Sequence, residues 1–579
     1  MDDVELSQHG RSSRIIDVVD PRDGAVDPDD LPGTCRHSSH ALRSDIDFRG
    51  LLHDDRRTAE ELNRDLALER ASGRENGQAD GCERGQDQSR SAQRHTAGQS
   101  TRGCSRRGSD RLLGVAPLDI SADRFEELAH RVVALATEYL ATLDEGLTVR
   151  PTSAASTSAA FDLPISDEGL GESILDDLTA ITAHVRANTG RRLPYVVGSG
   201  EPIAALGDFY ASILNQNVTA WRSAPAAVSI ERTVVSWLAE AVGCGNFSGT
   251  LISGGSLANL MGLAMAREAR APANESGAQP CVVYASDEVH MSIPKSVAAL
   301  GIGRDNLRLV RTDDDFRIDL EALEDAIAAD RRAGRKAIAL VASAGTITTG
   351  AIDPLPQLAE IARANELWLH VDGAYGAFAA LAEPAKLEGL SLADSISLDA
   401  HKWLYQPLDC SLLLYRDAQI ARSTFSYTGD YAKTLSGDPI EGFAFFEESL
   451  ELSRRFRALK LWLSIRYHGL AAFRSAIADN LRQAQLLAKL VEREPSLELL
   501  APVELSAVCF RWTDGPLDAL NGRNAEILRR VTERGHVLIS NANIRGIFGL
   551  RACIVNHRTT DDDVSAIVHE VVTAAREAE

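Results

Sequence analysis

Short apolar runs alternate with helix-like segments through the middle of this 579-residue chain. Examples are TLIS, CVVYAS, KAIALVAS, LWLHVD and DSISLD, and several of them lead into a stretch whose apolar residues recur at helical spacing. Strands that alternate with helices form βαβ units, whose strands lie parallel in a sheet that helices cover on both faces. The alternation therefore predicts a large α/β domain with a mostly parallel sheet.

The N-terminal region differs from the rest of the chain. Residues 1–114 include a long stretch, RASGRENGQADGCERGQDQSRSAQRHTAGQSTRGCSRRGSD, that is almost without apolar residues. Such a composition cannot bury enough surface to offset the entropy of ordering, so we expect a disordered low-complexity tail. Residues 115–195 then show helical spacing behind Ser121 or Asp123 as a helix cap, which predicts an N-terminal helical arm.

The C-terminal region shows a third pattern. The large domain is expected over residues 196–450. Beyond it come long helical segments, SLELSRRFRALKLWLSIRYHG and AAFRSAIADNLRQAQLLAKLVE, and then VCFRWT and GLRACIV as strands. We therefore expect a small C-terminal α+β domain over residues 451–579.

Charge and cysteine usage limit the possible partners. A net charge of −22 argues against nucleic acid or an anionic membrane surface as a partner of the folded body, because both would be repelled. No apolar run is long enough to span a bilayer. The eight cysteines are scattered without a C-x-x-C pair, so we expect neither a metal site nor a disulfide framework. These features predict a cytoplasmic protein.

The loops after the strands are where a ligand is expected, because doubly wound sheets bind ligands outside the carboxyl ends of their strands. The first loop, in TLISGGSLANL, is a glycine turn that leads into a helix. Gly255 lets the backbone approach a ligand, and the N–H groups at a helix start attract anions. Gly255 and Ser256 are therefore candidates for a phosphate site, although a serine that only caps the helix explains the same letters.

Two further loops carry aromatic or hydroxyl side chains near strand ends. His290 follows CVVYAS, where its ring could stack on a planar cofactor or simply face solvent. Thr346 and Thr348 follow KAIALVAS, where their hydroxyl groups could bind a ligand or only form a turn. Each of these signals is weak when it is taken alone.

Asp372 and Lys402 form a more specific pair. Asp372 ends LWLHVD, where a carboxylate needs a cation or good donors, and the small residues after it leave room for a flat ligand. Lys402 follows DSISLD, although a lysine is seldom buried without a partner. A lysine imine together with an acidic partner for the ring nitrogen is typical of pyridoxal phosphate. The two residues therefore predict pyridoxal 5'-phosphate as the cofactor.

Three segments, HVDGAYGA, SLDAHKWLYQPLDCSLLLYRD and SRRFRALKLWLSIRYHG, resemble the pyridoxal-phosphate-dependent group II amino-acid decarboxylases, relatives of aromatic-L-amino-acid and glutamate decarboxylases. The resemblance runs from about Leu112 to the C-terminus. It implies a fold type I enzyme with a mostly parallel seven-stranded sheet in its large domain. It also implies a homodimer with active sites at the subunit interface.

The resemblance assigns roles to single residues. Lys402 would hold the cofactor covalently, and Asp372 would pair with the pyridine nitrogen. His290 would stack on one face of the ring, with Ala374 on the other. The phosphate would be held by Gly255, Ser256 and His401.

Two positions depart from the family pattern. The threonine that usually helps in the threonine-rich loop corresponds to Ile347, so Thr346 or Thr348 would replace it. The asparagine usual before the His-Lys pair is Asp399 here, which alters the expected phosphate contacts.

Tyr431, in STFSYTGDYAKTLSG, bears on the type of reaction. In the decarboxylases, a tyrosine on a loop after the lysine protonates the carbanion, whereas relatives with phenylalanine there tend to run oxidative aldehyde-forming chemistry. The resemblance therefore implies simple decarboxylation, with Lys402, Tyr431 and His290 as catalytic residues. An ordinary loop aromatic explains Tyr431 about as well without the family.

An L-amino acid is the expected substrate, in first place an aromatic one such as tryptophan, tyrosine or dihydroxyphenylalanine. SRRFRALKLWLSIRYHG and Tyr431 resemble that branch, whereas NQNVTAW resembles glutamate and diaminobutyrate decarboxylases at least as much. Those two substrates remain an alternative, and so does transamination or carbon–sulfur lyase chemistry on the same fold. A non-catalytic protein that acts by association is the alternative from another class.

Overall fold

A seven-stranded sheet forms the core of the computed structural model of this protein, which describes residues 118–427 and 438–578. Its strands follow the order β1-β7-β6-β5-β4-β2-β3. β7 runs antiparallel to both of its neighbours, and every other neighbouring pair is parallel. The predicted mostly parallel sheet is thereby confirmed. The strands are β1 (Ser248–Ile252), β2 (Val282–Ser286), β3 (Leu307–Val310), β4 (Ala337–Ser343), β5 (Trp368–Asp372), β6 (Ser395–Asp399) and β7 (Ser411–Tyr415).

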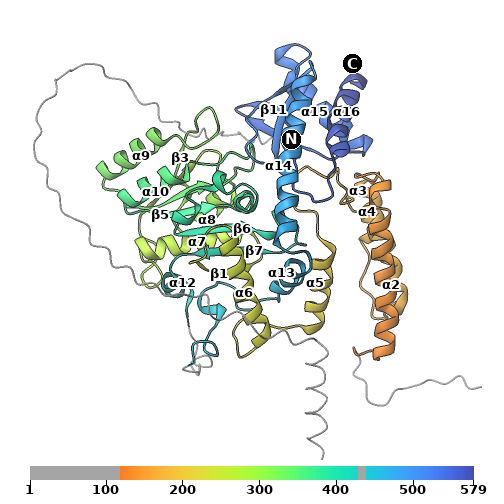
Figure 1. The fold of residues 1–579 in the computed structure, drawn as a ribbon, viewed down its shortest axis with the longest axis horizontal. Coiled ribbons are helices and arrows are strands. Elements are labelled where there is room, and N and C mark those ends of the chain that lie inside the picture. Colours follow the sequence, from red (N-terminus) through yellow and green to blue (C-terminus); the bar gives the residue numbers. More distant parts are fainter. Residues whose placement is uncertain (1–117, 428–437, 579) are drawn as a thin grey trace, which may run out of the picture. The chain divides into compact units, whose positions relative to one another are not determined.

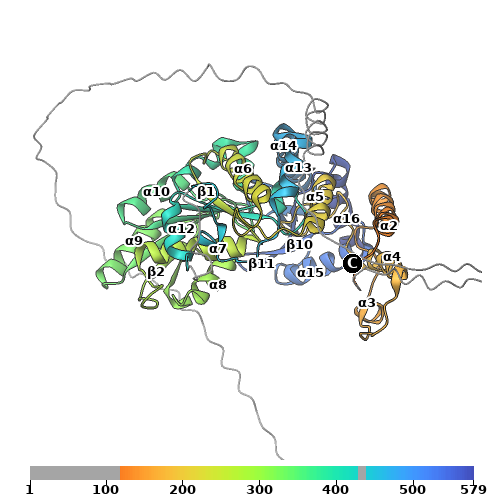
Figure 2. The same cartoon turned by 90° about the horizontal axis from the view of Figure 1, so that it is seen from below.

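Successive residues of each strand face opposite sides of the sheet. Leu412 and Leu414 belong to one buried apolar cluster, whereas Leu413 and Tyr415 belong to another. Helices therefore cover both faces, as nearly continuous apolar strands require (Figures 1 and 2). The first cluster includes side chains of α6 (Pro225–Ala241), α9 (Leu320–Arg332) and α10 (Leu355–Ala364), and the second includes side chains of α7 (Gly255–Arg270), α8 (Ser292–Ala299) and α12 (Ala418–Phe425).

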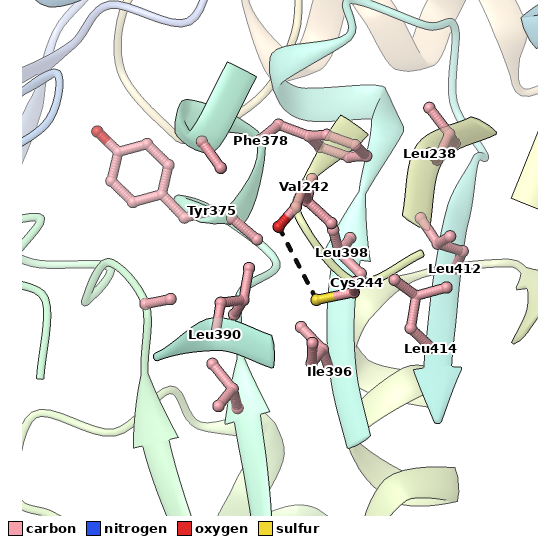
Figure 3. Close-up of a cluster of buried hydrophobic side chains, with 14 of the residues drawn as sticks. Leu238, Val242, Cys244, Tyr375, Phe378, Leu390, Ile396, Leu398, Leu412 and Leu414 are labelled. Carbon is pink, nitrogen blue, oxygen red and sulfur yellow. Dashed lines mark hydrogen bonds between the residues drawn. The ribbon is translucent and has the colours of Figure 1, made fainter. Parts of the chain in front are cut away.

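Figure 3 shows the centre of the first cluster. Ile396 of β6 pairs with Leu414 of β7, and both lie close to the sulfur of Cys244. This thiol lies 3.8 Å from the carbonyl oxygen of Val242. Burial raises the pKa of Cys244 to about 11, so the thiol stays protonated and packs as a small apolar group.

In the described part of the chain, four α-helices precede α6 and the sheet. The first begins after Ser121, whose hydroxyl accepts a hydrogen bond from the backbone N–H of Arg124 at 3.2 Å. Ser121 rather than Asp123 is therefore the helix cap. The helices are α2 (Ala122–Ala141), α3 (Ala154–Phe161), α4 (Asp176–His184) and α5 (Pro202–Leu214).

The C-terminal part builds a second, antiparallel sheet of four strands in the order β10-β11-β9-β8. Side chains of three helices share its apolar core, and these helices lie beside the sheet in Figure 1. β9 and β11 match two predicted strands, whereas the sequence pattern did not indicate β8, which is short, or β10, which is largely polar. The elements are α13 (Ala458–His468), α14 (Leu470–Arg493), β8 (Leu497–Leu499), β9 (Ala507–Trp512), α15 (Leu520–Arg534), β10 (Ser540–Ile544), β11 (Ile547–Cys553) and α16 (Asp561–Glu577).

The helix expected over SLELSRRFRALKLWLSIRYHG is shorter than predicted, because α13 begins only at Ala458. Upstream of it, the buried Arg454 donates hydrogen bonds to the carbonyl oxygens of Val218 at 2.6 Å and Leu251 at 2.8 Å. Arg454 also pairs with Glu231. A buried guanidinium needs such partners, and the irregular chain before Ala458 lets Arg454 reach them.

Short helical turns complete the unit Leu112–Glu579, to which all described residues belong. None of the described helices has both the length and the apolar character needed to cross a membrane. The tail predicted over residues 1–114 lies outside the described residues. The turns are η1 (Leu143–Glu145), η2 (Gly171–Leu175), η3 (Arg304–Asn306), η4 (Ala377–Leu381), η5 (Pro384–Leu387), η6 (Leu390–Leu392), α11 (Ala400–Trp403), η8 (Phe445–Glu447) and η9 (Leu517–Ala519).

Candidate active site

Residues at or just beyond the carboxyl ends of β1, β4, β5 and β6 line a cavity of about 280 Å³. His290, beyond the end of β2, joins them. Loops that are far apart in the sequence thus converge where a ligand is expected in a mostly parallel sheet. Eight residues predicted for the site line this cavity, namely Gly255, Ser256, His290, Thr346, Asp372, Ala374, His401 and Lys402. The ninth, Tyr431, lies outside the described residues.

The start of α7 forms one wall of the cavity. The helix begins at Gly255, and Gly254 is its N-cap residue, without a side-chain capping hydrogen bond. Ser256 is therefore the second residue of the helix and does not cap it. A Cβ atom added to Gly255 would lie 3.0 Å from the Cβ atom of Ala374 and 3.0 Å from each carboxylate oxygen of Asp399. Glycine therefore lets the helix N-terminus, with its positive dipole end, approach the cavity closely.

Asp372 ends β5 and is buried. Its Oδ1 atom accepts hydrogen bonds from the hydroxyl of Ser397 at 3.1 Å and from the backbone N–H of Ala374 at 3.2 Å. Its Oδ2 atom accepts one from the side-chain amide of Asn259 at 2.7 Å. Three donors thus satisfy the carboxylate inside the protein, as a buried anion requires.

Lys402 lies on the short helix α11, just after β6. Its ammonium nitrogen is 2.9 Å from Oδ2 of Asp399, and the lysine side chain is 18% exposed. Asp399 also accepts a hydrogen bond from the hydroxyl of Ser411 at 2.5 Å, and Nε2 of His401 lies 3.5 Å from it. Burial raises the pKa of Asp399, but Lys402 and His401 outweigh it, so this pKa lies below its usual value. The residue is therefore negatively charged at neutral pH.

His290 and the threonine loop complete the lining. Nδ1 of His290 is 2.7 Å from the hydroxyl of Ser292, and burial lowers the pKa of His290 although Asp372 acts in the opposite direction. Of the two threonines considered for the loop, Thr346 lines the cavity, and its hydroxyl is 2.9 Å from that of Thr349. Thr348 is not among the lining residues, but Ile347 is.

Asn259 is a lining residue that the sequence analysis missed. It is buried on α7 and binds Asp372 of the neighbouring strand β5. Its position, one helical turn after Gly255, could have indicated it, because residues four apart lie on one face of a helix. Val196 and Leu408 also line the cavity without having been predicted.

Residues 161–513 match the family model described as the pyridoxal-dependent decarboxylase conserved domain, and this range contains every described residue that lines the cavity. The chain belongs to the pyridoxal-dependent decarboxylase family. The family expected from the sequence motifs is thereby confirmed. The protein is accordingly a pyridoxal-phosphate-dependent carboxy-lyase, and pyridoxal phosphate is its cofactor.

The chain is also similar to individual relatives and solved structures. An aromatic-L-amino-acid decarboxylase from Bacillus atrophaeus is 36% identical over 66% of this chain and 81% of its own length. The crystal structure of Catharanthus roseus tryptophan decarboxylase in complex with L-tryptophan is similar with a TM-score of 0.72 and 26% identity, covering 80% of this chain and 100% of that one. Rhodiola rosea 4-hydroxyphenylacetaldehyde synthase is similar with a TM-score of 0.72 and 27% identity, over 79% and 99% of the two chains.

Replacing Asp399 by asparagine is expected to strengthen binding of pyridoxal phosphate. The Asp399 carboxylate lies beside Gly255 at the start of α7, where it would repel a phosphate group, and it pairs with the Lys402 amine in its charged form. We expect the dissociation constant of the Asp399→Asn variant to fall roughly tenfold, or ~1.4 kcal/mol, in an absorbance titration with the cofactor.

The matched control for this experiment is Asp394→Asn. Asp394 precedes β6, at the opposite end of the strand from Asp399, and it does not line the cavity. Its variant should bind the cofactor like the wild type. Unchanged or weaker binding by Asp399→Asn would contradict the repulsion argued for this carboxylate.

Proposed function

We propose that this protein decarboxylates an aromatic L-amino acid to the corresponding amine and carbon dioxide. The observation that carries the proposal is its 36% identity to the Bacillus atrophaeus aromatic-L-amino-acid decarboxylase. Apolar side chains in the cavity lining, from Val196, Ile347 and Leu408, support an aromatic substrate. Among the described lining residues there is no arginine, and Lys402 is the one lysine, so no second strong cation is present there for the side-chain carboxylate of glutamate.

The residues of the cavity fit the cofactor by their chemistry. The amine of Lys402 would bind its aldehyde carbon, and Asp372 would accept a hydrogen bond from its ring nitrogen. His290 and Ala374 would lie against the two ring faces. When bound, pyridoxal phosphate supplies the electron sink that stabilises the carbanion left by carbon dioxide. Its phosphate would be held at the N-terminus of α7 by Gly255, Ser256, His401 and Thr346.

These residues would select the reaction by orientation. A bond at Cα breaks readily only when it stands perpendicular to the ring, because the developing charge must overlap the π system. By fixing the ring on both faces and at its phosphate end, the protein would present the carboxylate of the substrate in that direction. Buried Asp372, with its three donors, would hold a fixed negative charge at the ring nitrogen without reorganisation during the reaction.

Release of labelled carbon dioxide from a panel of carboxyl-labelled amino acids tests the proposed reaction. With added cofactor, we expect release from tryptophan, tyrosine or dihydroxyphenylalanine, and none from the Lys402→Ala variant because it lacks the amine that takes up the cofactor. A Lys386→Ala variant, which removes a lysine outside the cavity, should keep the activity of the wild type. Release only from glutamate or diaminobutyrate would overturn the substrate class, and a keto acid product would indicate transamination.

Tyr431 is proposed to return the proton to Cα of the product amine, on the ground of the sequence resemblance. The Tyr431→Phe variant should then yield less amine and more aldehyde, ammonia and hydrogen peroxide, because a carbanion that is not protonated can instead pass two electrons to dissolved dioxygen, and water then releases the aldehyde and ammonia. Product analysis by chromatography, with Tyr427→Phe as the control for a nearby tyrosine, measures this ratio. An unchanged yield of amine from Tyr431→Phe would remove the role.

We further propose that the protein is a homodimer that uses one face of α5. The small residues Ala204, Gly207 and Ala211 are buried, and a Cβ atom on Gly207 would lie 2.8 Å from the Cα atom of Lys460 on α13. The helix thus packs closely on that side. Its other side is apolar at helical spacing, yet it is exposed at Leu206 (57%), Phe209 (48%), Tyr210 (55%) and Ile213 (52%).

An apolar stripe of this kind marks an interaction surface, and a second copy of the chain can cover it with the same stripe about a twofold axis. The neighbouring α2 extends the apolar surface, since the rings of Phe125 and Phe209 stack with centroids 6.5 Å apart.

The described cysteines are all buried and free, which supports the cytoplasm as the proposed location.

The double variant Phe209→Glu with Ile213→Glu is expected to be monomeric, because two charges per copy would be buried without partners. Light scattering of the eluting protein should show the mass of one chain for this variant and of two chains for the wild type. Leu517→Glu, at a residue 78% exposed on η9, should remain dimeric. A wild type that elutes as a monomer would contradict the proposed dimer.

A further inference from the structure

A buried chain of polar side chains lies behind Asp372. Its central member is Asn259 of α7, which is 1% exposed. The side-chain nitrogen of Asn259 donates to Asp372 at 2.7 Å and to the hydroxyl oxygen of Ser292 at 2.8 Å. Its side-chain oxygen lies 2.9 Å from Nε2 of His370. Both N–H donors of this amide and one of the two lone pairs of its oxygen are therefore in use.

The direction of each hydrogen bond follows from Asp372. A carboxylate only accepts, so Asn259 must turn its nitrogen toward Asp372 and its oxygen toward His370. His370 must then donate from Nε2. Burial lowers the pKa of His370 to about 4, so the ring is neutral at pH 7 and its Nδ1 atom accepts from the hydroxyl of Ser395 at 2.8 Å. Ser395 in turn accepts from the indole N–H of Trp368 at 2.8 Å.

The same logic reaches the ring of His290. The hydroxyl oxygen of Ser292 accepts from Asn259, which leaves the hydroxyl proton of Ser292 for Nδ1 of His290, 2.7 Å away. A neutral His290 then carries its proton on Nε2. One amide, that of Asn259, thus links the carboxylate at the ring nitrogen site to the histidine expected on the ring face.

Space around His370 is as restricted as its hydrogen bonds. A Cβ atom on Gly262 of α7 would lie 2.5 Å from two atoms of the His370 ring. His370 is 0% exposed, and its side chain lies on the face of β5 that packs against α7. It has no freedom to turn away from Asn259, and it therefore fixes which end of the amide faces Asp372.

We propose that Asn259 and His370 are positioning residues for Asp372. Asn259 holds the carboxylate in the orientation that receives the ring N–H of the cofactor, and His370 prevents the amide from flipping its oxygen toward the carboxylate. A carboxylate has about four lone-pair sites, and the three protein donors leave one of them for the cofactor. The proposal rests on the role proposed for Asp372 at the ring nitrogen.

The test compares binding of two cofactors, pyridoxal phosphate and its 1-deaza analogue, in which carbon replaces the ring nitrogen. Only the first can donate to Asp372, so the ratio of the two dissociation constants reports that one contact. We expect Asn259→Ala and His370→Leu to reduce the preference for pyridoxal phosphate by roughly tenfold or more, as for a lost hydrogen bond to a charged group. In both variants, the dissociation constant of the deaza analogue should stay within about twofold of its value for the wild type.

His370→Gln is the conservative control, because its side-chain nitrogen can take the place of Nε2 and donate to Asn259. This variant should keep most of the preference. If Asn259→Ala and His370→Leu weaken both cofactors equally, the residues serve only to maintain the structure, and the proposal is overturned. An unchanged ratio in Asn259→Ala would overturn it as well.

Asp372→Ala separates this proposal from the role of Asp372 itself. If both Asp372→Ala and Asn259→Ala lose the preference for pyridoxal phosphate over its deaza analogue, the result supports the role of Asp372 at the ring nitrogen and the positioning role of Asn259. Loss in Asp372→Ala alone overturns the positioning role and leaves the role of Asp372 intact. A preference that is absent from the wild type, or that survives Asp372→Ala, overturns the role of Asp372 and the proposal with it.

Discussion

The close approach of α7 to the central sheet is the constraint on which the site depends. At Gly255 and Gly262, a Cβ atom would come within 3.0 Å or less of side chains from β6 and β5. Larger residues there would lift the helix from the sheet and separate Asn259 from Asp372. Because the helix lies so close, it presents its N-terminus to the cavity and, one turn later, an amide to the buried carboxylate.

A second support comes from the C-terminal sheet, which holds the loop after β4. Arg551 of β11 donates to the carbonyl oxygen of Ile347 at 2.6 Å. The thiol sulfur of Cys509 on β9 lies 3.2 Å from the carbonyl oxygen of Thr348. Tyr375, another lining residue, is 2.8 Å from the hydroxyl of Ser506. The parts of the cavity wall that follow β4 and β5 are thus held by residues more than a hundred positions further along the chain.

Much of the fold and site followed from the sequence because the signals were local. Most strands of the seven-stranded sheet are short runs rich in apolar residues, and the loop residues predicted for the cavity follow such runs, so that parallel strands bring them to one edge. The hydrogen bonds of Asn259 and Ser397 to Asp372 could not be predicted, because Asp372 comes from another element of the fold, although the helical spacing of Asn259 from Gly255 pointed to the cavity. The late start of α13 could not be predicted for a similar reason. It depends on Arg454, whose partners Val218, Glu231 and Leu251 lie far away in the sequence. The pairing of Asp399 with Lys402 is likewise visible only in three dimensions.

The position of β1 has a consequence for synthesis on the ribosome. Among the described residues, β1 is the first strand of the sheet to be made, yet it lies at an edge, and its one strand neighbour is β7, the last strand of that sheet to be made. Ser248 pairs with Tyr415, so the connection between them must be complete before β1 can be paired. Pairings of such long sequence separation form slowly. The glycine turn at the start of α7 therefore leaves the ribosome early but reaches its final place only after the lysine of the site has emerged.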